Sequence, residues 1–223
     1  MHITNVALAV RDLPTAADFY EGTLGLPVDR TPHVARVRVG TSTLSLTQNP
    51  AHEGAHHVAI TVPSNKFPEA KAWVRERADL LDADGADEFE CSPTWNAHSV
   101  YFEGGDGTVL EFIVRRELDN ETTGPFTSSD LLSVSEVGVA VPDLPATIDA
   151  LSKRFDIVPY GWNSADFAPV GDVHGLLILV NPGRAWFPTT NLVAEITPID
   201  VTAKSAVTAQ LILNSASQLR LEN

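Results

Sequence analysis

Three segments of the sequence begin with a polar or ionisable residue and continue with small residues at alternate positions. Asn5, His57 and Glu136 stand at the heads of these segments, and Ser45 and Glu111 lie in later segments with the same alternation. In a strand, alternate side chains share one face, so small residues leave a hollow into which the polar heads point. The pattern predicts a ligand cleft on a curved sheet. The alternative is a half-exposed sheet whose polar residues face water.

These segments belong to an internal repeat. Residues 5–18 (NVALAVRDLPTAAD) and 136–149 (EVGVAVPDLPATID) are identical at seven of 14 positions without a gap, and a weaker copy begins at His57. Each copy reads as a strand, a helix and then two or three strands, with Asp12, Asn65 and Asp143 as the predicted helix N-caps. Three units therefore begin near residues 3, 55 and 134.

The remaining segments look less regular. Residues 118–130 are polar with Gly and Pro, which is typical of a linker. Residues 201–223 are rich in Ala, Ser and Thr with little patterning, so we expect an irregular tail.

Charge and composition exclude several classes of partner. The net charge is −14, which disfavours nucleic acids and anionic membranes as partners. The longest unbroken apolar run covers residues 176–180, far short of the roughly 20 residues of a membrane helix. The single cysteine, Cys91, has no disulfide partner in the chain. We expect a soluble cytoplasmic protein that binds a small molecule.

Three segments resemble the vicinal oxygen chelate superfamily of glyoxalases, bleomycin-resistance and fosfomycin-resistance proteins and extradiol dioxygenases. They are residues 5–28 (NVALAVRDLPTAADFYEGTLGLPV), 56–63 (HHVAITVP) and 99–112 (SVYFEGGDGTVLEF). The resemblance implies an α+β fold of repeated βαβββ units that form curved mixed sheets, with helices packed on the outer face. It implies that units 1–50 and 55–117 pair to enclose the cleft, followed by a degenerate third unit at 131–200.

The resemblance also implies a set of metal ligands. His57 and Glu111 match the ligand positions of the second unit, and Asn5 stands where the family usually has a histidine. Such a site would hold a divalent metal (Fe, Mn, Ni, Zn or Mg), more weakly than a site with two imidazoles. We expect no metal on the third unit, because Glu136 faces a wholly apolar closing strand.

The same resemblance assigns roles to nearby residues. Glu111 or another carboxylate of the cleft would move a proton. Tyr101 would donate a hydrogen bond to the substrate, although it also fits a cross-strand packing role. Trp95, Asn96 and Ser45 would complete the substrate-binding set, with a packing role as the alternative for Trp95.

Two functions follow from these expectations, beside a purely structural role that the two metal-poor units would allow. The first is a glyoxalase- or dioxygenase-type enzyme, an isomerase, lyase or ring-cleavage enzyme, whose metal chelates two adjacent oxygens of a small substrate. The alternative is a metal-free protein of the bleomycin-resistance type that binds and sequesters a small molecule such as a drug.

The third unit raises the question of quaternary structure. A unit without a partner exposes a sheet edge or face, so we expect the third unit to pack on the first two units or, in a homodimer, on its copy in a second chain. Residues 181–188 contain Arg, Trp and Phe and would form the contact, or would instead plug the third unit.

Overall fold

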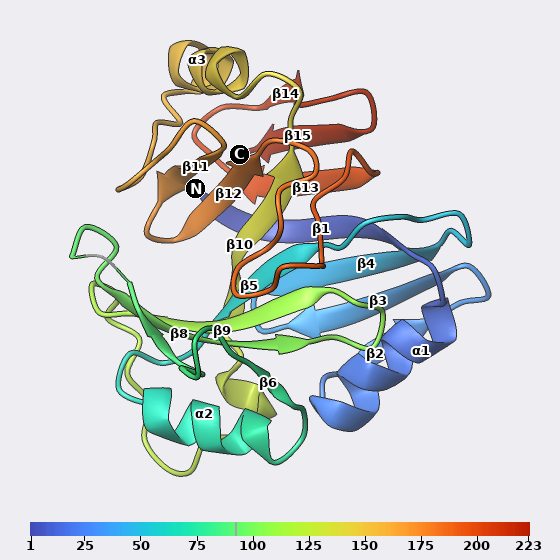
Figure 1. Ribbon diagram of the computed structural model, residues 1–223, viewed down its shortest axis with the longest axis vertical. Coiled ribbons are helices and arrows are strands. Elements are labelled where there is room, and N and C mark those ends of the chain that lie inside the picture. The colour runs from blue at the N-terminus through green and yellow to red at the C-terminus, as the bar shows by residue number, and fades with distance from the viewer. Residues whose placement is uncertain (92) are drawn as a thin grey trace.

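The computed structural model describes residues 1–91 and 93–223, whose strands form two twisted mixed sheets (Figure 1). The first unit comprises β1 (His2–Val10), α1 (Leu13–Asp18) with a following π-helical turn (Phe19–Thr23), β2 (Val28–Arg30), β3 (Val34–Val39) and β4 (Ser42–Gln48). Asp12 caps α1, since its Oδ1 accepts a 3.0 Å hydrogen bond from the Thr15 backbone N–H. This confirms the predicted cap.

The second unit follows the same order with additional short strands. It comprises β5 (His57–Thr61), α2 (Phe67–Arg75), β6 (Leu80–Leu81), β7 (Phe89–Glu90), β8 (Ala97–Glu103) and β9 (Val109–Arg115). The predicted cap at Asn65 is wrong: Lys66 occupies the N-cap position of α2 and makes no side-chain capping bond.

The third unit begins after a capped 3₁₀ turn (Ser128–Asp130). It comprises β10 (Ser133–Ala140), α3 (Leu144–Phe155), β11 (Phe167–Asp172) and β12 (Gly175–Val180). Asp143 caps α3 through a 2.9 Å bond from the Ala146 N–H, as predicted. The three helices lie outside the sheets, with α1 against β3 and β4, α2 against β8 and β9, and α3 against β11 (Figure 1).

The C-terminal residues are not a tail. They form β13 (Ile199–Lys204), β14 (Ala209–Ile212) and β15 (Ser217–Glu222). Alternate residues of these strands, such as Val201, Leu219 and Leu221, are buried in the main hydrophobic core. The pattern of period two was present in the sequence, but the small residues Ala203, Ala209 and Ser217 at positions of the inward face made it weak.

The pairing of the units differs from the expected arrangement of units one and two. The second and third units share one sheet, in the order β11-β12-β10-β5-β9-β8-β6, with β5 antiparallel to β10. The first unit instead pairs with the C-terminal strands, in the order β14-β15-β13-β1-β4-β3-β2. Figure 1 shows β13 beside β1 and β10 beside β5. The described chain therefore contains four strand units: the first and last units along the sequence share one sheet, and the second and third units share the other.

The two sheets meet through β1, β4 and β10. The Ser42 hydroxyl donates to the Ile3 carbonyl (2.7 Å) and accepts from the Val134 N–H (2.9 Å), so it joins the sheets. A single buried cluster includes apolar residues of both sheets and the inner faces of the helices. No helix among the described residues is long and apolar enough to span a membrane.

Packing of β15 into the core gives a stability prediction. Leu219→Ala removes a fully buried side chain and should lower the free energy of unfolding by about 2–5 kcal/mol. Ile212→Ala on the neighbouring β14 is the matched control, because Ile212 is 64% exposed and its loss should change stability by less than about 0.5 kcal/mol. Urea denaturation measures both, and equal effects would contradict the placement of these strands.

Candidate functional site

Strand register brings three ionisable residues to one face of the second sheet. His57 begins β5, and Glu111 lies on the parallel neighbour β9, opposite Ala59. Glu136 lies on β10, which pairs with β5 from the other side, and is also opposite Ala59. One small residue is thus flanked by two carboxylates, with the imidazole two residues away on the same face.

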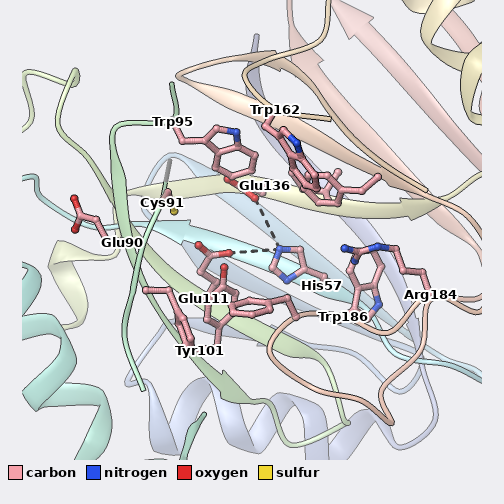
Figure 2. A pocket seen from close by; sticks show the side chains of 14 residues that line it. His57, Glu90, Cys91, Trp95, Tyr101, Glu111, Glu136, Trp162, Arg184 and Trp186 are labelled. Carbon is pink, nitrogen blue, oxygen red and sulfur yellow. Dashed lines mark ion pairs between the residues drawn. The ribbon is translucent and has the colours of Figure 1, made fainter. Parts of the chain in front are cut away.

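The three side chains converge in a buried cluster (Figure 2). The Nε2 atom of His57 lies 3.5 Å from Oε2 of Glu111 and 3.9 Å from Oε2 of Glu136. One donor atom from each residue lies within 4.8 Å of the others, and all three side chains are buried. His57 Nδ1 is 3.2 Å from the Val109 carbonyl, a contact that orients the ring with Nε2 toward the carboxylates.

Each carboxylate has a second partner that fixes it. The Ser99 hydroxyl donates to Oε1 of Glu111 at 2.5 Å. The Arg115 guanidinium donates to Oε1 of Glu136 through Nη2, and its Nε donates to the Ser135 hydroxyl at 3.1 Å. Arg115 is completely buried, so it places a permanent positive charge beside the cluster.

Burial and mutual repulsion shift the proton affinities of the cluster. Burial, together with the nearby charge of Glu136, raises the pKa of Glu111 to about 7. Burial alone would lower the pKa of His57, but the Glu136 and Glu111 carboxylates raise it above its ordinary value. At neutral pH the cluster therefore tends to retain protons that the same groups would release in water.

The cluster faces a pocket of about 400 Å³ whose other walls are mainly aromatic (Figure 2). Apolar residues of the second unit (Phe89, Trp95 and Tyr101) and of the third unit with its following loop (Trp162, Phe167, Ile178, Trp186 and Phe187) line it. Glu90, Cys91 and Arg184 complete the lining. A small apolar cavity with a few convergent polar groups is the usual form of a small-molecule site.

Trp186 comes from the loop after β12 and depends on a glycine. Its indole N–H donates to the Ala55 carbonyl at 2.8 Å, and its ring lies 5.3 Å from the His57 ring. A Cβ atom at Gly138 would lie 2.3 Å from the Trp186 ring, so only glycine at this position of β10 admits the indole. Trp186 of the loop 181–188 therefore packs onto β10 of the third unit, while a dimer contact through the same loop stays a prediction.

The structure brings together some of the residues that the sequence assigned to the site. His57, Glu111, Tyr101 and Trp95 all line the pocket, and Tyr101 is the cross-strand partner of Glu111. Asn96 is adjacent but is not a lining residue: its backbone carbonyl accepts from the Arg116 N–H at 3.0 Å.

Asn5 and Ser45 lie elsewhere, on β1 and β4 of the first sheet. There the Ser45 hydroxyl donates to Oδ1 of Asn5 at 2.9 Å. The expectation that Asn5 joins His57 and Glu111 was wrong, because it depended on a pairing of the first unit with the second.

Glu136 is the residue that sequence reasoning misjudged. The absence of a carboxylate on β12 made the third unit look metal-poor, but Glu111 supplies the carboxylate from the neighbouring unit. The repeat contained the signal, since Glu136 aligns with Asn5 and His57 at the head of its strand. Arg115 and Arg184 had no comparable signal, because neither belongs to a repeated position.

The cluster fits a divalent metal ion by its donors. One imidazole nitrogen and two carboxylates form a mixed set of the kind used for Fe(II), Mn(II) or Zn(II). Two buried carboxylates close together, one with its pKa raised to about 7, are relieved electrostatically by a cation between them. Among the described residues, this is the one group of three or more His, Cys, Asp or Glu side chains with such spacing.

The profile of the Glyoxalase/Bleomycin resistance protein/Dioxygenase superfamily matches residues 2–119, and the chain belongs to this superfamily. Its fold is similar to the crystal structure of a "putative dioxygenase" from Bacillus subtilis subsp. subtilis str. 168 (TM-score 0.64, 14% identity, covering 99% of this chain and 85% of that chain). It is also similar to glyoxalase I from Zea mays (TM-score 0.58, 12% identity, covering 99% and 91%). No curated protein sequence matches the chain.

The raised pKa of Glu111 predicts a pH-dependent stability difference. In the folded chain Glu111 holds its proton up to about pH 7, whereas the unfolded chain releases it near the ordinary value of 4.5. The folded state thus binds more protons between these values, and the contribution of Glu111 to stability falls as pH rises. For metal-free protein in chelator, we expect Glu111→Gln to gain stability relative to the unsubstituted chain between pH 5 and 8, by about 3 kcal/mol.

Guanidinium denaturation at several pH values measures this difference. Glu103→Gln is the control, because Glu103 lies on β8 but is exposed, so the same substitution there should change the free energy of unfolding by less than about 0.5 kcal/mol. A Glu111→Gln difference that stays constant over this range would show that the carboxyl is not perturbed in the fold.

Proposed function

We propose that this protein is a metal-dependent enzyme that acts on a small molecule with two adjacent oxygen atoms. The observation that carries the proposal is the convergence of His57, Glu111 and Glu136 in the aromatic pocket. The donor set of one nitrogen and two carboxylates favours harder ions, so we propose Mn(II) or Fe(II) ahead of Ni(II) or Zn(II). A bound ion of this kind acts as a Lewis acid toward substrate oxygens.

The residues favour proton transfer over dioxygen chemistry. Non-haem iron oxygenases typically use two histidines and one carboxylate, whereas this cluster has one histidine and two carboxylates. Glu111 lines the pocket beside His57 and is oriented by the Ser99 hydroxyl, so its carboxylate is placed to take a proton from a substrate bound at this point. We therefore propose an isomerase or lyase reaction in which Glu111 removes a proton from a substrate carbon or hydroxyl and returns it.

Two further groups would support this step. Burial raises the pKa of Tyr101 well above its usual value, so its phenol remains a hydrogen-bond donor at the substrate. Trp186 and the other aromatic walls exclude water, which strengthens the charge interactions inside the pocket.

Metal-free binding of a small molecule is the second candidate function, and one observation favours it. Buried Arg115 and a protonated His57 would balance the charges of Glu111 and Glu136 without any metal. In that case the pocket would hold a ligand through its aromatic walls and would perform no chemistry.

Metal analysis of the full chain distinguishes the two functions. We expect protein dialysed against Mn(II) to hold one equivalent by elemental analysis, with an affinity that rises with pH as the ligands lose protons. His57→Ala and Glu136→Gln should each weaken Mn(II) binding by more than about 100-fold in an EPR titration, since each removes a ligand.

Asn5→Ala is the matched control, because Asn5 occupies the corresponding position of the other sheet and should leave Mn(II) affinity unchanged. Stoichiometric binding that survives His57→Ala, or that is lost with Asn5→Ala, would contradict the proposed site. Protein that binds no divalent metal but binds an aromatic ligand would support the second candidate.

A further inference from the structure

The pocket combines aromatic walls with one permanent cation. Trp95, Trp162, Trp186 and Phe167 face the same space, and Trp162 stacks on Phe167 with ring centroids 5.8 Å apart. Arg184 is the one lysine or arginine among the described lining residues. Because flat apolar surfaces bind best to flat apolar ligands, the walls favour a planar ring system.

Arg184 is held in place by the loop that carries it. Its carbonyl accepts from the Ala194 N–H at 2.8 Å, and the neighbouring Gly183 N–H donates to the Ala194 carbonyl at 2.7 Å. Its guanidinium carbon lies 5.0 Å from the centre of the Phe167 ring. In Figure 2 the side chain extends from this loop toward the centre of the pocket. The cation is therefore preorganised at the pocket wall.

Arg184 has two polar partners within the chain, of which the charged one is weak. Its Nη1 donates to the neighbouring Ala185 carbonyl at 3.1 Å. Its Nε lies 3.4 Å from Oδ2 of Asp166, whose side chain is 54% exposed, and a pair of this type contributes little in water. Asp166 also accepts from the Ser164 hydroxyl at 2.5 Å, so its carboxylate is satisfied without the arginine. By contrast, the other charged lining residue at the rim, Glu90, is held by Arg116 at 2.6 Å. A ligand anion can replace Asp166 at low cost.

We propose that the natural substrate is a planar, largely aromatic molecule with a single carboxylate that binds Arg184. The planar guanidinium matches a carboxylate with two parallel hydrogen bonds. A single negative charge on an apolar body suits a pocket of about 400 Å³ in a chain of net charge −14, which repels polyanions. This assignment rests on the proposed function for the other end of the substrate. At that end, the two adjacent oxygens would face His57, Glu111 and Glu136.

Two probes of the same shape test the carboxylate. 2-Naphthoate and 2-naphthamide differ in charge but not in their fused rings, and their binding to the full chain can be measured by calorimetry. We expect naphthoate to bind about tenfold more tightly than naphthamide, since one charge-assisted bidentate pair is worth about that factor. Trp95, Trp162 and Trp186 are three of the four tryptophans, so their emission reports occupancy of the pocket.

Substitutions of Arg184 and Asp166 test whether the preference for naphthoate over naphthamide depends on Arg184. Arg184→Gln should reduce the naphthoate preference to less than about twofold while naphthamide affinity is retained, and Arg184→Lys should leave an intermediate preference. Asp166→Asn should raise naphthoate affinity up to about fivefold, because it removes the competing carboxylate. Arg220→Gln is the matched control, since Arg220 is an exposed arginine near Asp200 on the first sheet.

The measurement is made on chelator-treated protein and repeated with Mn(II), so that carboxylate binding to a metal is recognised. Equal affinity for the two probes, or a preference that survives Arg184→Gln and Arg184→Lys, would overturn the proposal. Loss of the preference with Arg220→Gln would also overturn it. An Arg184-dependent preference in protein that binds no metal would support this inference while contradicting the proposed metal-dependent reaction, so the two failures are distinguishable.

Discussion

The antiparallel pairing of β5 with β10 is the constraint on which the site depends. It places Ala59 opposite Glu136, while the parallel pairing of β5 with β9 places the same residue opposite Glu111. His57 then lies on the same face, two residues along β5. A shift of one residue in either register would turn a carboxylate to the helix-covered face, where it would be buried without a partner. The apolar residues on that face, such as Val58 and Val137, hold the register because they must remain in the core.

This placement has an electrostatic cost that links folding to binding. Two carboxylates in a low-dielectric site repel each other, and the protein offsets this with Arg115, with the Ser99 hydroxyl and with the raised pKa values of Glu111 and His57. A cation or a proton is therefore favoured at this point. The buried carboxylates that lower the stability of the folded chain are the same groups that would bind a metal or transfer a proton, as is common at functional sites.

The first sheet repeats the geometry without the chemistry. Its register places Asn5 at the position of His57, Ser45 at that of Glu111 and Asp200 at that of Glu136. Arg220 lies 4.0 Å from Asp200, so this set has an amide, a hydroxyl and one carboxylate that is already near a cation. Such a set is a poor metal site. The two sheets thus share the same strand register, but side chains suited to a metal are found in the second sheet.

The sequence by itself determined the local elements, namely the caps at Asp12 and Asp143, most strands and the repeated unit, and it also indicated the family and the placement of His57 and Glu111 in one pocket. These depend on short-range patterns of period two and on capping chemistry, which a single sequence contains. Only the tertiary structure decided which unit pairs with which. Every unit presents a similar first strand to any other, so local pattern cannot distinguish β1–β5 pairing from β5–β10 pairing. The choice of partner is made by long-range packing of the whole core, which local sequence patterns do not report. Because β5 pairs with β10 and not with β1, the site contains Glu136 in place of Asn5.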